Sequence, residues 1–147
     1  MRRTVGAVVA ALLLAGCGAT LSSTQAARGW LQQSNFTKNQ RDTVVVAHQV
    51  ERLLRDPSSS ALLLHTVCSV LISDVSQLNG SLPTPDAQAT TQLSTAYDTI
   101  GNGANTCYNA AGHVATRTQA LHFLRAGITD LFFAALRLHV AAGQGPS

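Results

Sequence analysis

The feature that most constrains the fold of this chain is an apolar stripe that runs from residue 61 to residue 78. Its members are separated alternately by three and four residues, and they are Ala61, Leu64, Cys68, Leu71, Val75 and Leu78. This heptad-type spacing places all six side chains along one face of an α-helix. Such a helix is stable when other elements cover that face, so it is predicted to be a core helix.

Three further stretches show helical periodicity, and no stretch reads convincingly as a strand or as a repeat. They cover about residues 36–55, 84–111 and 115–142. The apolar face of the first stretch comprises Phe36, Thr43, Ala47, Val50 and Leu54. That of the second comprises Ala89, Leu93, Ala96, Ile100, Ala104, Cys107 and Ala111. That of the third comprises Leu121, Leu124, Ile128, Leu131, Ala135, Leu138 and Ala142. Short connections between four helices predict an all-α fold, an antiparallel up-down-up-down four-helix bundle.

Turn and cap residues set the expected boundaries of these helices. Asp56-Pro57 is expected to end the first helix and to begin the second, because Asp favours the N-cap and Pro the first helical position. Thr84-Pro85-Asp86 repeats that signal for the third helix. Gly101-Asn102-Gly103 lies inside the third helix, and two glycines there cost about 1 kcal/mol each relative to alanine. A kink or a break is therefore expected at residues 101–103.

The apolar faces of the third and fourth helices differ in the size of their side chains. The third is lined by small residues, so neighbouring backbones are expected to approach closely. On the fourth, Phe123, Phe132, Phe133 and Leu136 are expected to widen the apolar surface. Charged residues interrupt the fourth helix, so it is predicted to be a buried core helix and not a membrane span.

The amino terminus has the features of a targeting signal. Arg2 and Arg3 precede an uncharged apolar run, Val5 to Leu14, which is too short for the ~20 residues of a membrane-spanning helix. This is the pattern of a secretory signal peptide. The residues that follow, Leu14-Ala15-Gly16-Cys17, resemble the lipobox of bacterial lipoproteins. An ordinary signal peptide, with Cys17 removed or left free, is the alternative interpretation.

The lipobox resemblance implies that Cys17 receives a diacylglyceryl group and becomes the first residue of the mature chain. Two or three acyl chains form a stable membrane anchor, whereas one holds only marginally. The expected organisation is then a signal peptide at 1–16, a lipidated cysteine with a flexible tether at 17–33, and a helical bundle domain at 34–143. A short helix starting near Trp30 and lying against the bundle is compatible with this scheme.

Charge gives little indication of a nucleic acid partner. The chain has 147 residues with ten Lys and Arg against seven Asp and Glu, and loss of Arg2 and Arg3 leaves eight against seven. Phosphate binding needs several clustered basic residues, so no nucleic acid partner is expected. Nine of the ten basic residues are arginine and alanine is abundant, a composition that resembles small lipoproteins of actinobacteria, including mycobacteria.

Cys68 and Cys107 are the two cysteines that follow Cys17. Export to an oxidising compartment favours a disulfide between them. In a plain hairpin of the second and third helices the two are out of register. Either an extended connection at 79–84 or a break at 101–103 is needed to bring them together. A separation of their Cα atoms above about 7 Å would exclude the disulfide.

Residues for catalysis or cofactor binding are scarce. The five histidines are His48, His65, His113, His122 and His139, and His48 with His65 is the most metal-like pair. Zinc takes three or four ligands, and carboxylates near this pair are few, so no metal site is expected. The chain has a single glutamate, no Cys-x-x-Cys-His and no Gly-x-Ser-x-Gly, so neither a cofactor nor an enzyme activity is expected.

Aromatic residues offer one candidate binding surface. Tyr97 and Tyr108 are eleven residues apart and are predicted to share a helix face, with Trp30 nearby if the tether folds back. Filling of the boundary beside the core is the simpler interpretation. The expected function is a non-enzymatic binding or structural module of the cell envelope, lipid-anchored on the outer face of the membrane. It would dock an envelope protein. The alternative is a carrier that holds an apolar ligand between the third and fourth helices.

Overall fold

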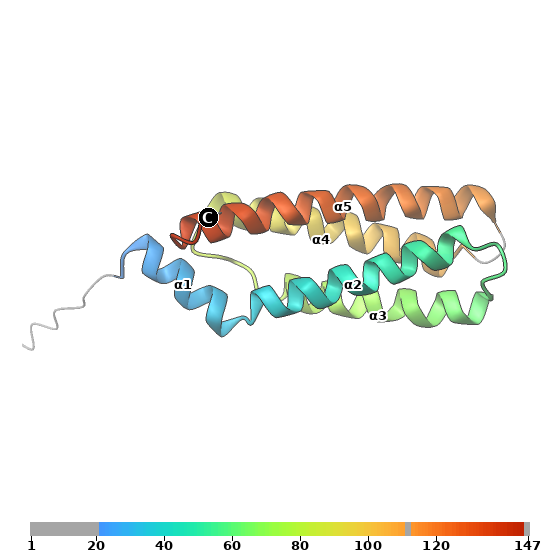
Figure 1. Cartoon of the computed structure of the whole chain (residues 1–147), viewed down its shortest axis with the longest axis horizontal. Coiled ribbons are helices and arrows are strands. Elements are labelled where there is room, and N and C mark those ends of the chain that lie inside the picture. Colours follow the sequence, from blue (N-terminus) through green and yellow to red (C-terminus); the bar gives the residue numbers. More distant parts are fainter. Residues whose placement is uncertain (1–20, 111–112, 146–147) are drawn as a thin grey trace, which may run out of the picture.

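The computed structural model describes residues 21–110 and 113–145, and these residues form five α-helices (Figure 1). Their bounds are α1 Ser23–Gln33, α2 Phe36–Arg55, α3 Ala61–Asn79, α4 Ala87–Tyr108 and α5 Val114–Ala141. The described part of the chain contains no strand, which confirms the predicted all-α class. Helices α2 to α5 lie side by side, and their packing is that of a helical bundle.

Helix α1 lies in the segment, residues 17–33, that was predicted to be a flexible tether. Ser22 accepts a hydrogen bond from the Gln25 backbone N–H, and the Gln25 side chain accepts one from the Ser22 N–H. This reciprocal capping box stabilises the first turn of a helix. Ala27 and Leu31 are buried against the bundle. Residues 23–33 are therefore an ordered helix, because they bury an apolar face that a flexible tether would leave in water.

The predicted cores of α2, α3 and α4 are largely confirmed. Helix α2 begins and ends at the predicted residues, and every member of its predicted apolar face is buried. Along α3 the stripe from Leu64 to Leu78 is buried, and Ala61 is exposed because the helix begins there. Ser60, whose side chain accepts from the Leu63 N–H, is the N-cap of α3 in place of the predicted Asp56. On α4 the predicted face is buried through Cys107, and Ala111 lies outside the described residues.

The expected break at residues 101–103 is absent, and α4 runs unbroken from Ala87 to Tyr108. The reason is packing against α5. A Cβ atom added to Gly103 would lie 2.9 Å from Leu124 Cδ2, and one added to Gly127 would lie 2.6 Å from Ile100 Cγ1. Each helix thus places a glycine beneath a large side chain of the other. This close approach offsets the conformational cost of Gly103 inside the helix.

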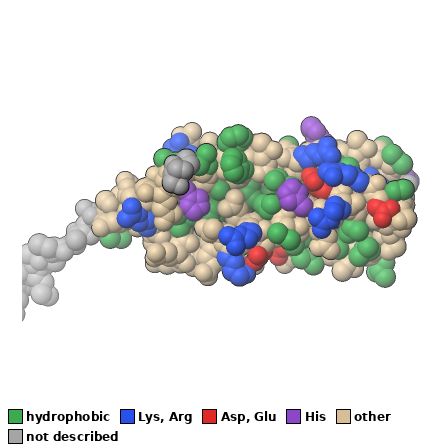
Figure 2. Space-filling view, in the orientation of Figure 1, with side chains coloured by type: hydrophobic (Ala, Val, Ile, Leu, Met, Phe, Trp, Pro, Cys, Tyr) green, Lys and Arg blue, Asp and Glu red, His purple; other side chains and the backbone are tan. Residues whose placement is uncertain are grey.

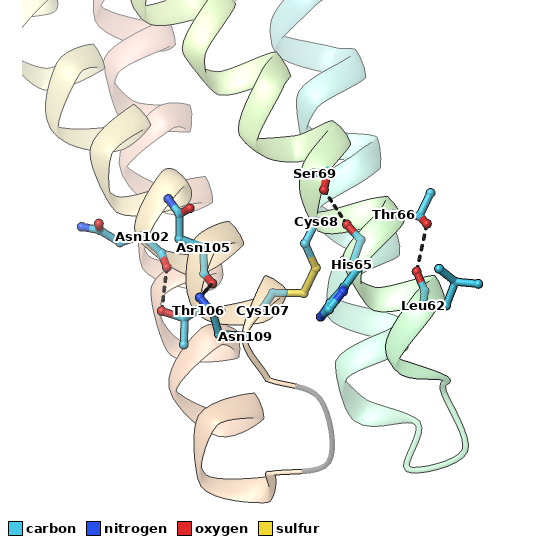
Figure 3. The surroundings of a disulfide bond; sticks show 10 residues. All are labelled: Leu62, His65, Thr66, Cys68, Ser69, Asn102, Asn105, Thr106, Cys107 and Asn109. Atoms are coloured by element: carbon cyan, nitrogen blue, oxygen red, sulfur yellow. Dashed lines mark hydrogen bonds between the residues drawn. A yellow bond between two sulfur atoms is a disulfide. The ribbon is translucent and has the colours of Figure 1, made fainter.

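The disulfide between Cys68 and Cys107 is confirmed, with the two Cα atoms 6.1 Å apart (Figure 3). Cys68 lies eleven residues before the end of α3, and Cys107 lies twenty residues after the start of α4, a mismatch of roughly 14 Å at ~1.5 Å per residue. Residues 80–86 form an extended connection that can span at most about 25 Å. The connection, and not a helix break, brings the cysteines into register.

Of the helices that the structure describes, α3 alone is long and apolar enough by length and composition to cross a membrane. Core helices of soluble bundles share these properties. Helix α3 packs against both α2 and α4, and Leu64 and Leu71 are fully buried, whereas Leu62, Leu63 and Val70 on its other faces are exposed. It is therefore a core helix of the bundle.

Candidate binding surfaces

Tyr108 lies near the disulfide end of the bundle. Its ring stacks on the His65 imidazole, with ring centroids 4.4 Å apart and an angle of 12° between the planes. Figure 3 shows His65 beside the Cys68–Cys107 bridge. Tyr108 remains exposed at 40%, so the stack leaves an aromatic edge at the surface.

Trp30 fastens α1 to the opposite end of α3. Its indole Nε1 donates a hydrogen bond to the Ser81 carbonyl at 3.3 Å, and its ring lies 5.4 Å from that of Phe36. His65 and Ser81 are sixteen residues apart, which is ~24 Å along a helix axis. Trp30 and Tyr108 therefore do not form a common surface, because they pack against opposite ends of the same helix.

Tyr97 is completely buried, and does not lie at the exposed boundary that its spacing from Tyr108 predicts. Burial raises the pKa of its hydroxyl above the usual tyrosine range. This hydroxyl has no hydrogen-bond partner among the described residues. A buried polar group without a partner costs about 1–3 kcal/mol, so its presence calls for an explanation.

Tyr97 lines a surface groove of about 490 Å³ between α3 and α4. The α3 side of the groove consists of Ile72, Val75, Ser76 and Asn79, and the α4 side consists of Tyr97, Asp98, Gly101, Asn102 and Asn105. A Cβ atom on Gly101 would have Val75 Cγ1, 3.9 Å away, as its nearest neighbour. The missing side chain of Gly101 thus leaves open space in the groove.

The apolar surface that Phe132, Phe133 and Leu136 were predicted to add to the last helix lies on its exposed side, outside the core. Phe132 and Phe133 are each 59% exposed, and Leu136 and Val140 are exposed on the same side of α5. The core face of α5 is built from small and large residues together, including Ala120, Gly127 and Ala134. Because these small residues let α4 pack close to α5, α4 covers one stripe of α5. Phe132 and Phe133 lie outside that stripe.

A second groove, of about 300 Å³, lies between α2 and α5 beside this exposed face. It is lined by Thr37, Gln40, Arg41, Val44, Val45, Ile128 and Phe132. Figure 2 views the molecule from the α2 and α5 side and shows basic side chains interspersed with apolar patches on this face. Helices α2 and α5 together carry seven basic and three acidic residues.

The other side of the bundle has the opposite character. Helices α3 and α4 carry two acidic residues, Asp74 and Asp98, and no lysine or arginine. All eight basic residues that follow residue 16 lie on α1, α2 and α5. The bundle therefore has a basic side and an uncharged to acidic side, a division that the near-neutral overall charge conceals.

A cluster around Glu51 joins α2 to α5. Glu51 is buried, and its carboxylate lies 3.0 Å from Arg55 Nη2, 3.5 Å from His48 Nδ1 and 3.8 Å from Arg125 Nε. The spacing from Glu51 to Arg55 is a helical ion-pair signal that the sequence shows. The approach of Arg125 from α5 has no such local signal. The cluster pairs the only glutamate of the chain with cations, a structural role.

The described residues contain no group of three or more His, Cys, Asp or Glu side chains that could hold a metal ion. The two histidines of the most metal-like pair have separate partners, since His48 lies beside Glu51 and His65 stacks on Tyr108. Cys17, the predicted lipidation site, lies outside the residues that the structure describes.

Comparison of this chain with family models, with curated proteins and with solved structures finds no match.

Proposed function

We propose that this protein is a lipid-anchored lipoprotein of the outer face of the cell membrane, a non-enzymatic module whose α2/α5 face rests on the anionic lipid surface. In this proposal Cys17 carries the lipid, residues 1–16 are the signal peptide, and the bundle has antiparallel up-down-up-down topology. The observation that carries it is the exposure of Phe132, which lines the α2/α5 groove together with Arg41.

Aromatic and aliphatic side chains beside basic ones are the combination that binds anionic bilayers. Fully burying a phenylalanine is worth about 1.5–3 kcal/mol, so the exposed part of each ring has about 1 kcal/mol left to gain. Each basic residue near an anionic surface adds about 1 kcal/mol. Arg41 and Arg125 flank the apolar residues with largely exposed side chains, and are placed to contribute.

The position of α1 supports the same orientation. Helix α1 lies at the end of the bundle where α5 finishes (Figure 1), and Arg28 Nε donates a hydrogen bond to the Ala142 carbonyl there. Cys17 and Ser23 are six residues apart, so the chain between them spans at most about 20 Å. A lipid on Cys17 would hold the exposed apolar half of α5 close to the headgroups.

The packing between α4 and α5 favours this module over a carrier of apolar ligands. The carrier hypothesis needs a cavity between these two helices. Gly103 lies directly against Leu124, and Gly127 against Ile100, so closely that a single methyl group has no room at either place. A ligand held between the two helices at these places would have to displace this contact.

The orientation can be tested with an environment-sensitive fluorophore on the lipidated protein. Thr129→Cys places one thiol on the exposed face of α5, three and four residues before Phe132 and Phe133. Ser73→Cys, on the exposed side of α3, is the matched control. Because Cys68 and Cys107 are paired and Cys17 would be acylated, the new thiol is the one that reacts. We expect a blue-shifted emission from position 129, and not from position 73, on anionic vesicles.

Two further sets of measurements complete the test. Replacing Phe132 and Phe133 by serine, or using uncharged vesicles, is expected to remove the shift at position 129. Cys17→Ser is expected to abolish the acyl mass in mass spectrometry and to release the protein from the membrane fraction. Equal emission at positions 129 and 73 would reject the orientation, and an unchanged mass after Cys17→Ser would reject the anchor.

A further inference from the structure

The α2/α5 seam, the line along which these two helices pack, carries four arginines and two grooves. Arg41 lines the groove of about 300 Å³ described above. A second groove, of about 260 Å³, lies farther along the seam and is lined by Arg55 and Arg117. Arg125 of α5 lies between the two grooves, beside Glu51 of α2. Positive charge therefore recurs at three places along the seam.

The acidic residues of these two helices leave the surface of the seam to the arginines. Asp42 lines a groove shared with α3, and Asp130 lines a groove shared with α4. Glu51 does lie on the seam, but its side chain is only 8% exposed. The side chains of Arg55 and Arg125 beside it are 49% and 61% exposed. A ligand that approaches the seam therefore meets the two arginines before it meets the carboxylate.

Glu51 holds the guanidinium groups of Arg55 and Arg125 at one place. Arg55 Nη2 donates a hydrogen bond to the carboxylate at 3.0 Å, and Arg125 Nε lies 3.8 Å from it, beyond hydrogen-bonding distance. This bond uses one N–H group of Arg55, and within the described part of the chain Arg125 donates none. Arg117, in contrast, already donates to two backbone carbonyls of the connection after α2. The unused donors are thus those of Arg55 and Arg125.

The chemistry of these donors indicates the class of ligand. A planar guanidinium binds the oxygens of a phosphate group through two parallel hydrogen bonds, and arginine is the residue that proteins favour for this purpose. Two guanidinium groups around one buried carboxylate carry a net positive charge. Since one group comes from α2 and the other from α5, their arrangement is set by the packed bundle and not by a mobile loop.

Apolar side chains flank the two arginines on both sides. They are Val44, Ile128 and Phe132 in the first groove, and Pro57, Val114 and Leu121 in the second. In Figure 2, apolar patches lie between the basic side chains on this face. Inorganic phosphate gains nothing from such surroundings, whereas a phospholipid carries glycerol and acyl groups next to its phosphate. The surroundings therefore favour a phosphate that belongs to a lipid.

We infer that Arg55 and Arg125 form a binding site for the phosphate group of an anionic phospholipid, whose glycerol and acyl parts contact the two flanking grooves. The inference rests on the proposed function, because it names the lipid group that the α2/α5 face contacts. It also goes further. Attraction to a charged surface depends only on the density of charge, whereas this site binds one lipid molecule and distinguishes one headgroup from another.

Native mass spectrometry of the lipidated full chain tests the site without a charged bilayer, in the uncharged detergent dodecyl maltoside. The probes are phosphatidylglycerol, phosphatidylcholine with the same acyl chains, and inorganic phosphate. We expect one phosphatidylglycerol to bind about tenfold more tightly than phosphatidylcholine, because the choline cation is repelled by the arginines and because charged hydrogen bonds have about this value. Inorganic phosphate at equal concentration is expected not to displace it, which distinguishes a lipid phosphate from a free one.

Three variants at matched positions localise the binding. Arg125→Gln is expected to weaken phosphatidylglycerol binding about tenfold. Arg137→Gln makes the same substitution on the same helix, at a side chain that pairs with Asp86 away from the seam, and is expected to leave binding unchanged. Arg125→Lys keeps the charge but removes the planar pair of donors, so it is expected to restore binding only in part.

Four results would overturn the inference. They are equal binding of the two phospholipids, displacement by inorganic phosphate, equal binding in Arg125→Gln and Arg137→Gln, and full binding in Arg125→Lys. Circular dichroism of each variant separates a loss of binding from a loss of structure. The vesicle experiment fails or succeeds independently: an emission shift at position 129 without a bound phospholipid in detergent would keep the orientation and reject this site.

Discussion

At the scale of single residues, two glycines determine how closely α4 and α5 approach. Gly127 lies beneath Ile100, and Gly103 lies beneath Leu124, so large and small side chains alternate across the contact. Protein cores are as densely packed as organic crystals, and added atoms must displace their neighbours. The neighbours of Gly127 include the Ile100 backbone nitrogen, 2.8 Å from an added Cβ atom, and backbone atoms move at a high cost.

Gly127→Ala is therefore expected to lower the free energy of unfolding by about 1–3 kcal/mol, the usual range for overpacking. Gly101→Ala is the matched comparison, because this glycine also lies inside a helix, α4, but an added Cβ atom there would meet only Val75 Cγ1, at 3.9 Å. It is expected to raise stability by up to about 1 kcal/mol through helix propensity. Urea denaturation followed by circular dichroism measures both, and equal shifts in the two variants would contradict the packing account.

At the scale of helices, the start of α4 depends on one carboxylate that also reaches α5. Asp86 accepts a hydrogen bond from the Ala89 N–H at 2.7 Å, and Arg137 donates to it from α5 at 3.1 and 3.2 Å. The Ala89 N–H and then the Arg137 guanidinium lower the pKa of Asp86 below its ordinary value of 3.8. A single residue thus begins one helix and ties it to the next.

The sign of the pH dependence follows from this lowered pKa. The stabilisation from ionised Asp86 is fully present above the ordinary pKa of 3.8, and it is lost as the pH falls through the lower pKa of the folded state. We expect Asp86→Asn to reduce the acid loss of stability, measured by urea denaturation between neutral and strongly acidic pH. Arg137→Gln keeps the cap and is expected to give an intermediate slope. Identical slopes in all three proteins would contradict this assignment.

At the scale of the whole molecule, the main features are the Cys68–Cys107 disulfide and the unequal distribution of charge between the two sides of the bundle. The disulfide joins α3 to α4, and α3 and α4 form the uncharged to acidic side that carries the groove lined by both helices. Basic residues and exposed aromatic rings lie on the opposite side.

Removal of the disulfide is expected to destabilise the whole bundle, because the bond closes a loop of 39 residues in the unfolded chain. The chain-entropy model gives about 4 kcal/mol for such a loop, and native disulfides cost about 2–5 kcal/mol when removed. Thermal unfolding of the Cys68→Ser/Cys107→Ser variant, with and without reductant, measures this effect. Reductant should lower the melting temperature of the native protein alone; an effect on the variant would point to another cause.

What the sequence by itself determined is local. Helical periodicity and cap residues correctly predicted the all-α class, the limits of α2 and the buried stripe of α3, because such signals act over three or four residues. Composition and compartment correctly predicted the Cys68–Cys107 pair. The lipid on Cys17, the absence of an enzyme activity and the membrane location stay predictions.

What only the tertiary structure decided depends on contacts between distant residues. The predicted main stripe of α5 is the one that the bundle covers, but only the packed structure shows that Phe132 and Phe133 beside it stay in water. The glycine contacts between α4 and α5 keep α4 unbroken at Gly103. The division into a basic side and an uncharged side likewise arises when α2 packs beside α5, since charges spread along a sequence become a surface only through packing.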